Sequence, residues 1–119
     1  MMRSSISTLA EKIRHKTGLD LQIGDLLTQA KTACDAGREP DSAIAPAVRS
    51  LIVRSKALAF DIGEVMMRAE PHEVRQAMGK AYDAGLVSAY IAYAKNPNGD
   101  AHDRILDALL YAATKNKPK

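Results

Sequence analysis

One run of apolar residues restricts the fold of this chain more than any other feature: a heptad pattern that begins at Ile44 and ends at Ala69. Its members alternate in steps of four and three residues, and they are Ile44, Val48, Leu51, Ser55, Leu58, Ile62, Val65 and Ala69. Such a seam predicts a helix that packs against other helices. The helix expected over residues 43–69 is roughly 40 Å long at 1.5 Å per residue. Pro46 must then lie in its first turn.

Shorter amphipathic segments on both sides of this helix predict further helices, because their apolar residues recur at helical spacing. These segments cover residues 5–16, 20–36, 70–82 and about 100–113. Gly18 and Gly37 are expected to end the first two, and Asp100 is expected to cap the last. Residues 86–95 form either a separate short helix or a continuation of the helix before them, since Gly85 resembles a C-terminal stop.

The composition favours helices over strands. Alanine supplies 20 residues and leucine 11, against 13 for isoleucine and valine together, and the chain has no Trp and one Phe. Small and unbranched apolar residues suit close-packed helices, whereas sheets favour β-branched and aromatic residues. We therefore expect an all-α fold, a compact bundle of about five helices around a long central helix at about residues 43–69. Leu51, Leu58 and Ile62 should be buried in it.

The length of the chain fits a single helical domain over residues 1–119, with a basic tail at 115–119 that frays. No stretch of about 18 apolar residues exists, so we expect no membrane span. The start of the chain lacks the apolar region of a secretory signal. Cys34 is the only cysteine, which excludes a disulfide within the chain. These features predict a cytoplasmic protein.

The chemistry-bearing residues do not assemble into a recognisable site, so we predict no catalytic residues, no cofactor and no metal. His72 and His102 stand at expected helix starts, where the neighbouring acidic residues serve as caps. A metal site would need at least three convergent ligands, which no local spacing supplies. Cys34 lies in the apolar column of its helix and is expected to be a buried, inert thiol.

A second apolar stripe runs along the long helix, nearly opposite the heptad seam. It consists of Val53, Phe60 and Met67, and Arg49, Lys56 and Glu64 flank it. A helix at the edge of a monomer needs only one apolar face. The long helix is therefore either central in the bundle or meets another chain through these six residues, most simply in a homodimer. In the second case Phe60→Asp should dissociate the dimer and leave a folded monomer.

Charge is distributed in blocks. Residues 19–41 sum to −3, while residues 42–60 carry Arg49, Arg54 and Lys56 and no acid. Alternating blocks indicate helices joined by salt bridges. We expect a small non-enzymatic regulatory protein that docks an apolar helix face on a protein partner or on itself. The alternatives are a nucleic-acid-binding accessory protein that uses residues 42–56 and the lysine tail, and an enzyme with a site around His72 or His102.

Overall fold

The computed structural model describes residues 2–115 and the side chains of residues 8–112. These residues form five α-helices and one 3₁₀ turn: α1 (Met2–Asp35), α2 (Ile44–Arg68), α3 (Pro71–Met78), η1 (Gly79–Ala81), α4 (Ala84–Lys95) and α5 (Ala101–Lys115). The described part of the chain contains no strand, so the predicted all-α fold is confirmed. The basic tail predicted at 115–119 lies outside the described residues, apart from Lys115 at the end of α5.

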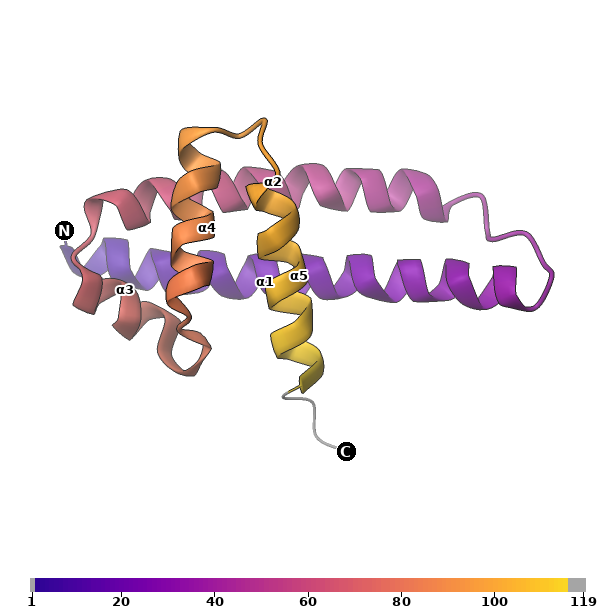
Figure 1. Cartoon of the computed structure of the whole chain (residues 1–119), viewed down its shortest axis with the longest axis horizontal. Helices are drawn as coiled ribbons and strands as arrows, with labels where there is room; N and C mark the ends of the chain where they lie inside the picture. Colours follow the sequence, from indigo (N-terminus) through magenta and orange to yellow (C-terminus); the bar gives the residue numbers. More distant parts are fainter. Residues whose placement is uncertain (1, 116–119) are drawn as a thin grey trace.

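The two long helices lie side by side and antiparallel, and the shorter helices cover only part of them (Figure 1). Helix α2 packs against α1 and against α4, while α5 packs against α4 and α1. Helices α4 and α5 cross one face of the α1–α2 hairpin near its middle, and the hairpin continues beyond α5 to its loop (Figure 1). We call residues 21–54, the part of the hairpin on the loop side that α5 borders at Gly24, the distal half, and the remainder of the hairpin the proximal half.

The prediction of two helices over residues 5–16 and 20–36 is wrong, because α1 passes through Gly18 without a break. Gly18 does not have the positive φ of a C-terminal glycine stop, which Gly37 has at 74°. A glycine inside a helix costs about 1 kcal/mol relative to alanine. Buried contacts on both sides of Gly18 outweigh that cost, and a Lys16–Asp20 ion pair of 2.8 Å spans it.

Helix α2 follows the heptad prediction closely. Leu51 and Ile62 are buried, whereas Leu58 is half-buried against the distal part of the core. Pro46 lies in the first turn, as expected, where its missing N–H leaves no helical bond unmade. The turn before the helix is held by the Asp41 carboxylate, which accepts a hydrogen bond of 2.9 Å from the Ala43 backbone.

The segment after α2 forms separate short helices. Pro71 occupies the first turn of α3, as predicted, and the Glu70 backbone donates to the Glu73 carboxylate in a capping box. The helix stop is Gly79, with a φ of 58°, and not Gly85 as expected. Asp83 instead begins α4, because its carboxylate accepts hydrogen bonds from the two backbone amides that start that helix. Residues 84–95 are therefore a separate helix.

The core has two parts of unequal size. The main core joins side chains of α1, α2, α3, α4 and α5 in and around the proximal half, whereas the distal core contains Leu19, Ile23 and Leu51 and belongs to α1 and α2 alone. Helices α2 and α4 approach closely at Gly63, where a Cβ would overlap the Tyr90 carbonyl oxygen and lie 2.7 Å from the Ala94 Cβ. The distal half thus depends on two helices, and the proximal half on five.

Candidate functional site: a buried polar network and an uncovered hairpin face

Four polar side chains from three helices meet inside the protein near the middle of the hairpin. Lys16 and Asp20 come from α1, Ser55 from the seam of α2, and His102 from the first turn of α5. The Ser55 hydroxyl donates to Asp20 Oδ1 at 2.6 Å, and Lys16 Nζ donates to Asp20 Oδ2 at 2.8 Å. His102 Nε2 lies 3.3 Å from Ser55 Oγ. All four side chains are at most 2% exposed, so they form a polar layer that joins three helices.

Burial dominates the electrostatics of this layer. It lowers the pKa of the Lys16 ammonium, although the Asp20 carboxylate acts in the opposite direction. Burial, then the positive charge of Lys16 and to a smaller extent that of Lys56, lower the pKa of His102 to about 4, while the negative charges of Asp20 and Asp103 act in the opposite direction. His102 is therefore neutral at pH 7, and the network holds one ion pair with a neutral imidazole beside it.

Two tyrosines of α4 complete the surroundings. The Tyr93 ring packs against the His102 ring at a centroid distance of 5.6 Å. Tyr90 is buried, and burial together with the Asp20 charge raises its pKa far above the ordinary value. Among the described residues, neither the Tyr90 hydroxyl nor His102 Nδ1 has a hydrogen-bond partner. Unsatisfied buried polar atoms of this kind destabilise the folded state.

The network contains a hydroxyl between a carboxylate and an imidazole, which are groups used in acid–base and nucleophilic chemistry. It is nevertheless sealed: a substrate would reach Ser55 only if the helices separated. His102 lies at a helix start, as expected, but it is also buried in this network, whereas His72 is exposed at the start of α3. The sequence feature that could have predicted this network is the polar pair Lys16 and Asp20 within an otherwise apolar heptad pattern of α1.

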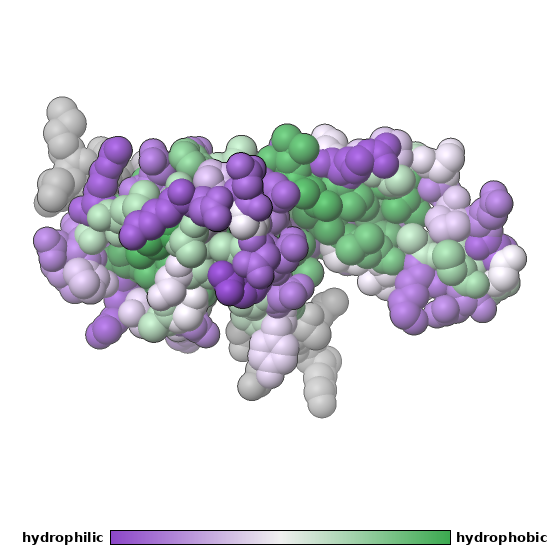
Figure 2. Space-filling view, turned by 45° about the horizontal axis from the view of Figure 1, so that its top comes forward, coloured by the Kyte–Doolittle hydropathy of each residue, from purple (hydrophilic) through white to green (hydrophobic). Residues whose placement is uncertain are grey.

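The second feature is the part of the hairpin surface next to α5, where apolar side chains are left uncovered. Figure 2 shows a continuous hydrophobic area over the hairpin beyond α5. Leu27 of α1 is 51% exposed, and Val48 and Ile52 of α2 are half-buried. Leu106 and Leu110 of α5 are also half-buried. The Leu110 side chain lies 3.3 Å from the position of a Cβ at Gly24, so this side of α5 borders the distal half.

We call these five residues the distal face: Leu27, Val48 and Ile52 form its floor, and Leu106 and Leu110 form its wall. Cys34 follows Leu27 by two helical turns and is exposed, so the prediction of a buried thiol is wrong. Leu27 and Cys34 are exposed for the same reason. In the proximal half this side of α1 is covered by other helices, but no described helix covers it in the distal half (Figure 1).

Within the described part of the chain, the cations on the α2 side of the distal face have no ion-pair partner. Arg49, Arg54 and Lys56 are exposed and form no ion pair with another described residue. Among the described residues, the one ion pair between different helices is Lys12–Asp61 at 3.4 Å, in the proximal half. The expected salt bridges between the acidic block at 19–41 and the basic block at 42–60 are therefore not formed within this part of the chain.

The predicted interface residues fall into different surroundings. Val53 is 68% exposed on α2, and Met67 is 40% exposed. Phe60, between them in the stripe, is half-buried and packs against the main core. Met67 also lines a groove of about 370 Å³ between α2, α3 and α4. Of the flanking residues, Arg49 and Lys56 are exposed and Glu64 is half-buried. The stripe is thus interrupted by the half-buried Phe60 and is not one exposed surface.

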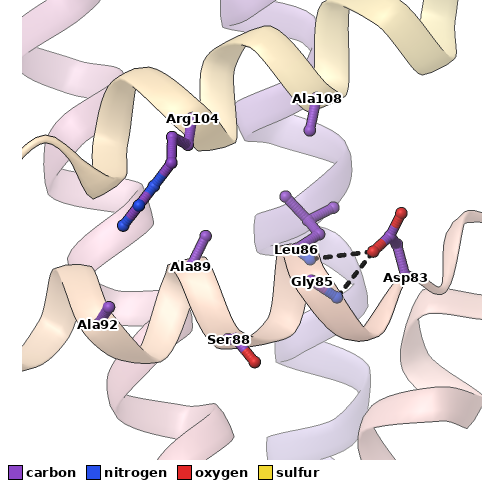
Figure 3. Close-up of a pocket in the computed structure, with 8 residues that line it drawn as sticks. All are labelled: Asp83, Gly85, Leu86, Ser88, Ala89, Ala92, Arg104 and Ala108. Carbon is purple, nitrogen blue, oxygen red and sulfur yellow. Dashed lines mark hydrogen bonds between the residues drawn. The ribbon is translucent and has the colours of Figure 1, made fainter.

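A further groove of about 480 Å³ lies between α4 and α5 (Figure 3). Its lining is made mostly of small residues, including Gly85, Ala89 and Ala108. The Asp83 carboxylate, at one end of the groove, accepts hydrogen bonds from two backbone amides of α4. Arg104 lines the groove from α5, and its Nη2 lies 3.7 Å from Asp100 Oδ1. The two charged groups of this groove, Asp83 and Arg104, therefore already have intramolecular partners.

Among the described residues, no group of three or more His, Cys, Asp or Glu side chains is placed to hold a metal ion. None of the described helices has the length and apolar character that crossing a membrane requires. Comparison of the chain with family models, with curated proteins and with solved structures finds no match.

Proposed function

We propose that this protein is a small helical interaction protein that docks a helical partner on its distal face. One observation carries the proposal: the same face of the hairpin is covered by α4 and α5 in the proximal half and left bare and apolar in the distal half. Exposed apolar areas bordered by polar residues are typical of interaction sites. Arg49, Lys56 and the exposed Val53 lie along its α2 side and belong to the rim of the proposed site.

The structure suggests a position-specific test. A photo-crosslinking amino acid is placed at Leu27, in the distal face, or at Gln22, which is exposed on the same helix and lies about 140° round it. In cells that make the protein, Leu27 should give a defined adduct and Gln22 should not. Equal adducts from both positions, or none from Leu27, would contradict docking at the distal face. The mass of the adduct shows whether the partner is this chain or another protein.

The alternative function, binding to nucleic acid, is supported by three exposed cations that form no ion pair with a described residue: Arg49, Arg54 and Lys56. Helical geometry weakens it, because Arg54 lies far round α2 from the other two and they do not form one stripe. The test is a titration with duplex DNA at increasing salt, since binding driven by phosphates weakens steeply as salt rises. Absence of salt-dependent binding would exclude it.

We also propose a cytoplasmic location for the protein. Cys34 is exposed and has no disulfide partner within the chain. A reducing compartment keeps such a thiol free.

A further inference from the structure

We infer that His102 is an acid-sensitive latch: as a neutral imidazole it joins α5 to the hairpin, and a proton added to it releases α5 while α1 to α4 stay packed. This inference goes beyond the docking role proposed above, because it concerns how the fold itself is held closed. Two features carry it: the directions of the hydrogen bonds in the polar network, and the way in which α5 is attached to the other helices.

The directions of the hydrogen bonds determine which nitrogen of His102 carries the hydrogen. Ser55 has one hydroxyl hydrogen, and the 2.6 Å bond to Asp20 Oδ1 uses it, because an ionised carboxylate can only accept. Ser55 Oγ therefore offers only lone pairs to His102 Nε2, 3.3 Å away, so this nitrogen must be the donor. The neutral ring thus has its hydrogen on Nε2, and Nδ1 is a bare acceptor with no partner among the described residues.

A further proton can enter the ring only at Nδ1, where the surroundings oppose it. The ring is buried, so the new N–H would have no acceptor from the described residues or from water. His102 also lies in the first turn of α5, and the positive end of a helix dipole disfavours a cation. The buried carboxylate that could balance the charge, Asp20, is already paired with Lys16. Titratable groups face the ring from every neighbouring helix: Lys16 and Asp20 of α1, Lys56 of α2, Tyr93 of α4 and Asp103 of α5 itself.

Helix α5 can leave without breaking the contacts among the other helices. It packs against α4 and α1 through one buried face, formed by Ala101, His102, Ile105 and Leu109. Helix α2 packs against α1 and α4, and α3 packs against α1, without the help of α5. Detaching α5 is therefore the smallest opening that brings a protonated His102 into water, and local openings of this kind need less free energy than unfolding of the whole protein.

Release of α5 would also change the distal face, because Leu106 and Leu110 of this helix form its wall. The wall is in place while His102 is neutral and is removed when α5 detaches. This consequence rests on the docking role proposed above, whereas the latch itself does not.

The first test is an NMR measurement of the imidazole nitrogens of the wild-type chain at pH 7. Long-range correlation of ring hydrogens with ring nitrogens distinguishes the two neutral tautomers, and His102 should show a protonated Nε2 and a bare Nδ1. The exposed ring of His72 in the same spectrum serves as a reference for a solvated histidine. A His102 ring with its hydrogen on Nδ1, or a charged ring at this pH, would overturn the inference.

The second test is amide exchange of the full chain between pH 7 and pH 5, corrected for the intrinsic pH dependence of exchange. The equilibrium constant for opening α5 should rise about 20-fold over this range, because the pKa of His102 is about 4 when the helix is docked and near 6.5 when it is released. Amides of residues 105–112 should report this opening and should exchange faster than those of residues 59–66 in α2 at both pH values. Equal opening constants for the two segments would show that acid unfolds the whole protein, and would overturn the latch.

His102→Gln is the matched variant, because its side-chain amide can still donate to Ser55 but takes up no proton. The acid-induced rise in α5 exchange should be lost in this variant and kept in His72→Gln, which removes the exposed histidine of α3. A rise that persists in His102→Gln would overturn the inference. If that variant does not fold, the two wild-type measurements still decide the question. None of these measurements involves a partner, so failure of the latch would leave the docking proposal standing.

Discussion

Lys16 and Asp20 stand at core positions of α1, and both are fully buried. Taking two charges out of water is expensive, and their attraction compensates only while both are present. Asp20 also links α1 to α2, because it accepts the hydrogen bond from Ser55 of α2. The layer therefore fixes the register of the hairpin: sliding α1 by one turn along α2 would break the buried hydrogen bond between the Ser55 hydroxyl and the Asp20 carboxylate.

Asp20→Asn tests this dependence, because the amide oxygen can still accept from Ser55 while the charge is lost. The Lys16 ammonium would then be buried without a counter-ion, and we expect the free energy of unfolding to fall by about 3–5 kcal/mol. Adding Lys16→Met should recover most of the loss, since the double variant buries no charge. Urea denaturation of the three proteins measures both effects. A double variant as unstable as Asp20→Asn would show that the ion pair is not the cause.

His102 should make the stability of the protein depend on pH. Its pKa is about 4 in the folded protein and near 6.5 when unfolded, so the unfolded chain binds the proton more readily between these values. The free energy of unfolding should therefore fall as the pH drops from 6.5 to 4, by roughly 3 kcal/mol in total. Above pH 6.5 this contribution is fully present. The groups that set it are Lys16, Asp20, Lys56 and Asp103.

The matched variant for this prediction is His102→Gln, which cannot take up the proton. Denaturation curves across the acidic range should show a shallower decline for this variant than for the wild type. Parallel curves for the two proteins between pH 6.5 and 4 would assign the acid sensitivity to other groups.

At the scale of the helices, the sequence predicted the packing seam of α2 but not that of α1. The α2 seam is apolar except for Ser55, so its length and its buried face could be predicted. The matching seam of α1 runs through Leu9, Ile13, Lys16, Asp20, Ile23 and Leu27 in the same steps of four and three. Lys16 and Asp20 interrupt its apolar pattern, and the sequence therefore predicted a helix end at Gly18.

The distal face could not be predicted for a different reason. Leu27 and Cys34 occupy core-type positions of α1, and their exposure follows from where α4 and α5 cross the hairpin. That crossing depends on contacts distant in sequence, such as Gly63 of α2 against α4. The network around His102 has the same origin, because Asp20 and Ser55 reach that histidine only after three helices have packed.

Gly63 and Gly18 provide a matched pair of helical glycines. A Cβ at Gly63 has no room between α2 and α4, so Gly63→Ala should lower the free energy of unfolding by about 1–3 kcal/mol. At Gly18 nothing lies within 4 Å of an added Cβ, and the φ is not positive. Gly18→Ala should therefore raise the free energy of unfolding by about 0.4–1 kcal/mol. Thermal or urea unfolding measures the change in the free energy of unfolding for each variant. Equal changes of the same sign would contradict the close contact between α2 and α4.

At the scale of the whole molecule, stability should be unevenly distributed along the hairpin. The distal core consists of three buried residues between two helices, whereas the main core joins five helices. Segments with few buried apolar contacts open at lower free energy than the rest of a protein. The two ends of α1 should therefore differ in amide protection, although they belong to one continuous helix.

Hydrogen exchange tests this distribution. Amides of residues 24–34 and 47–54 should exchange faster than those of residues 9–20 and of α4, because fewer buried apolar contacts must break before the distal segments open. Uniform protection along α1 would contradict the uneven core.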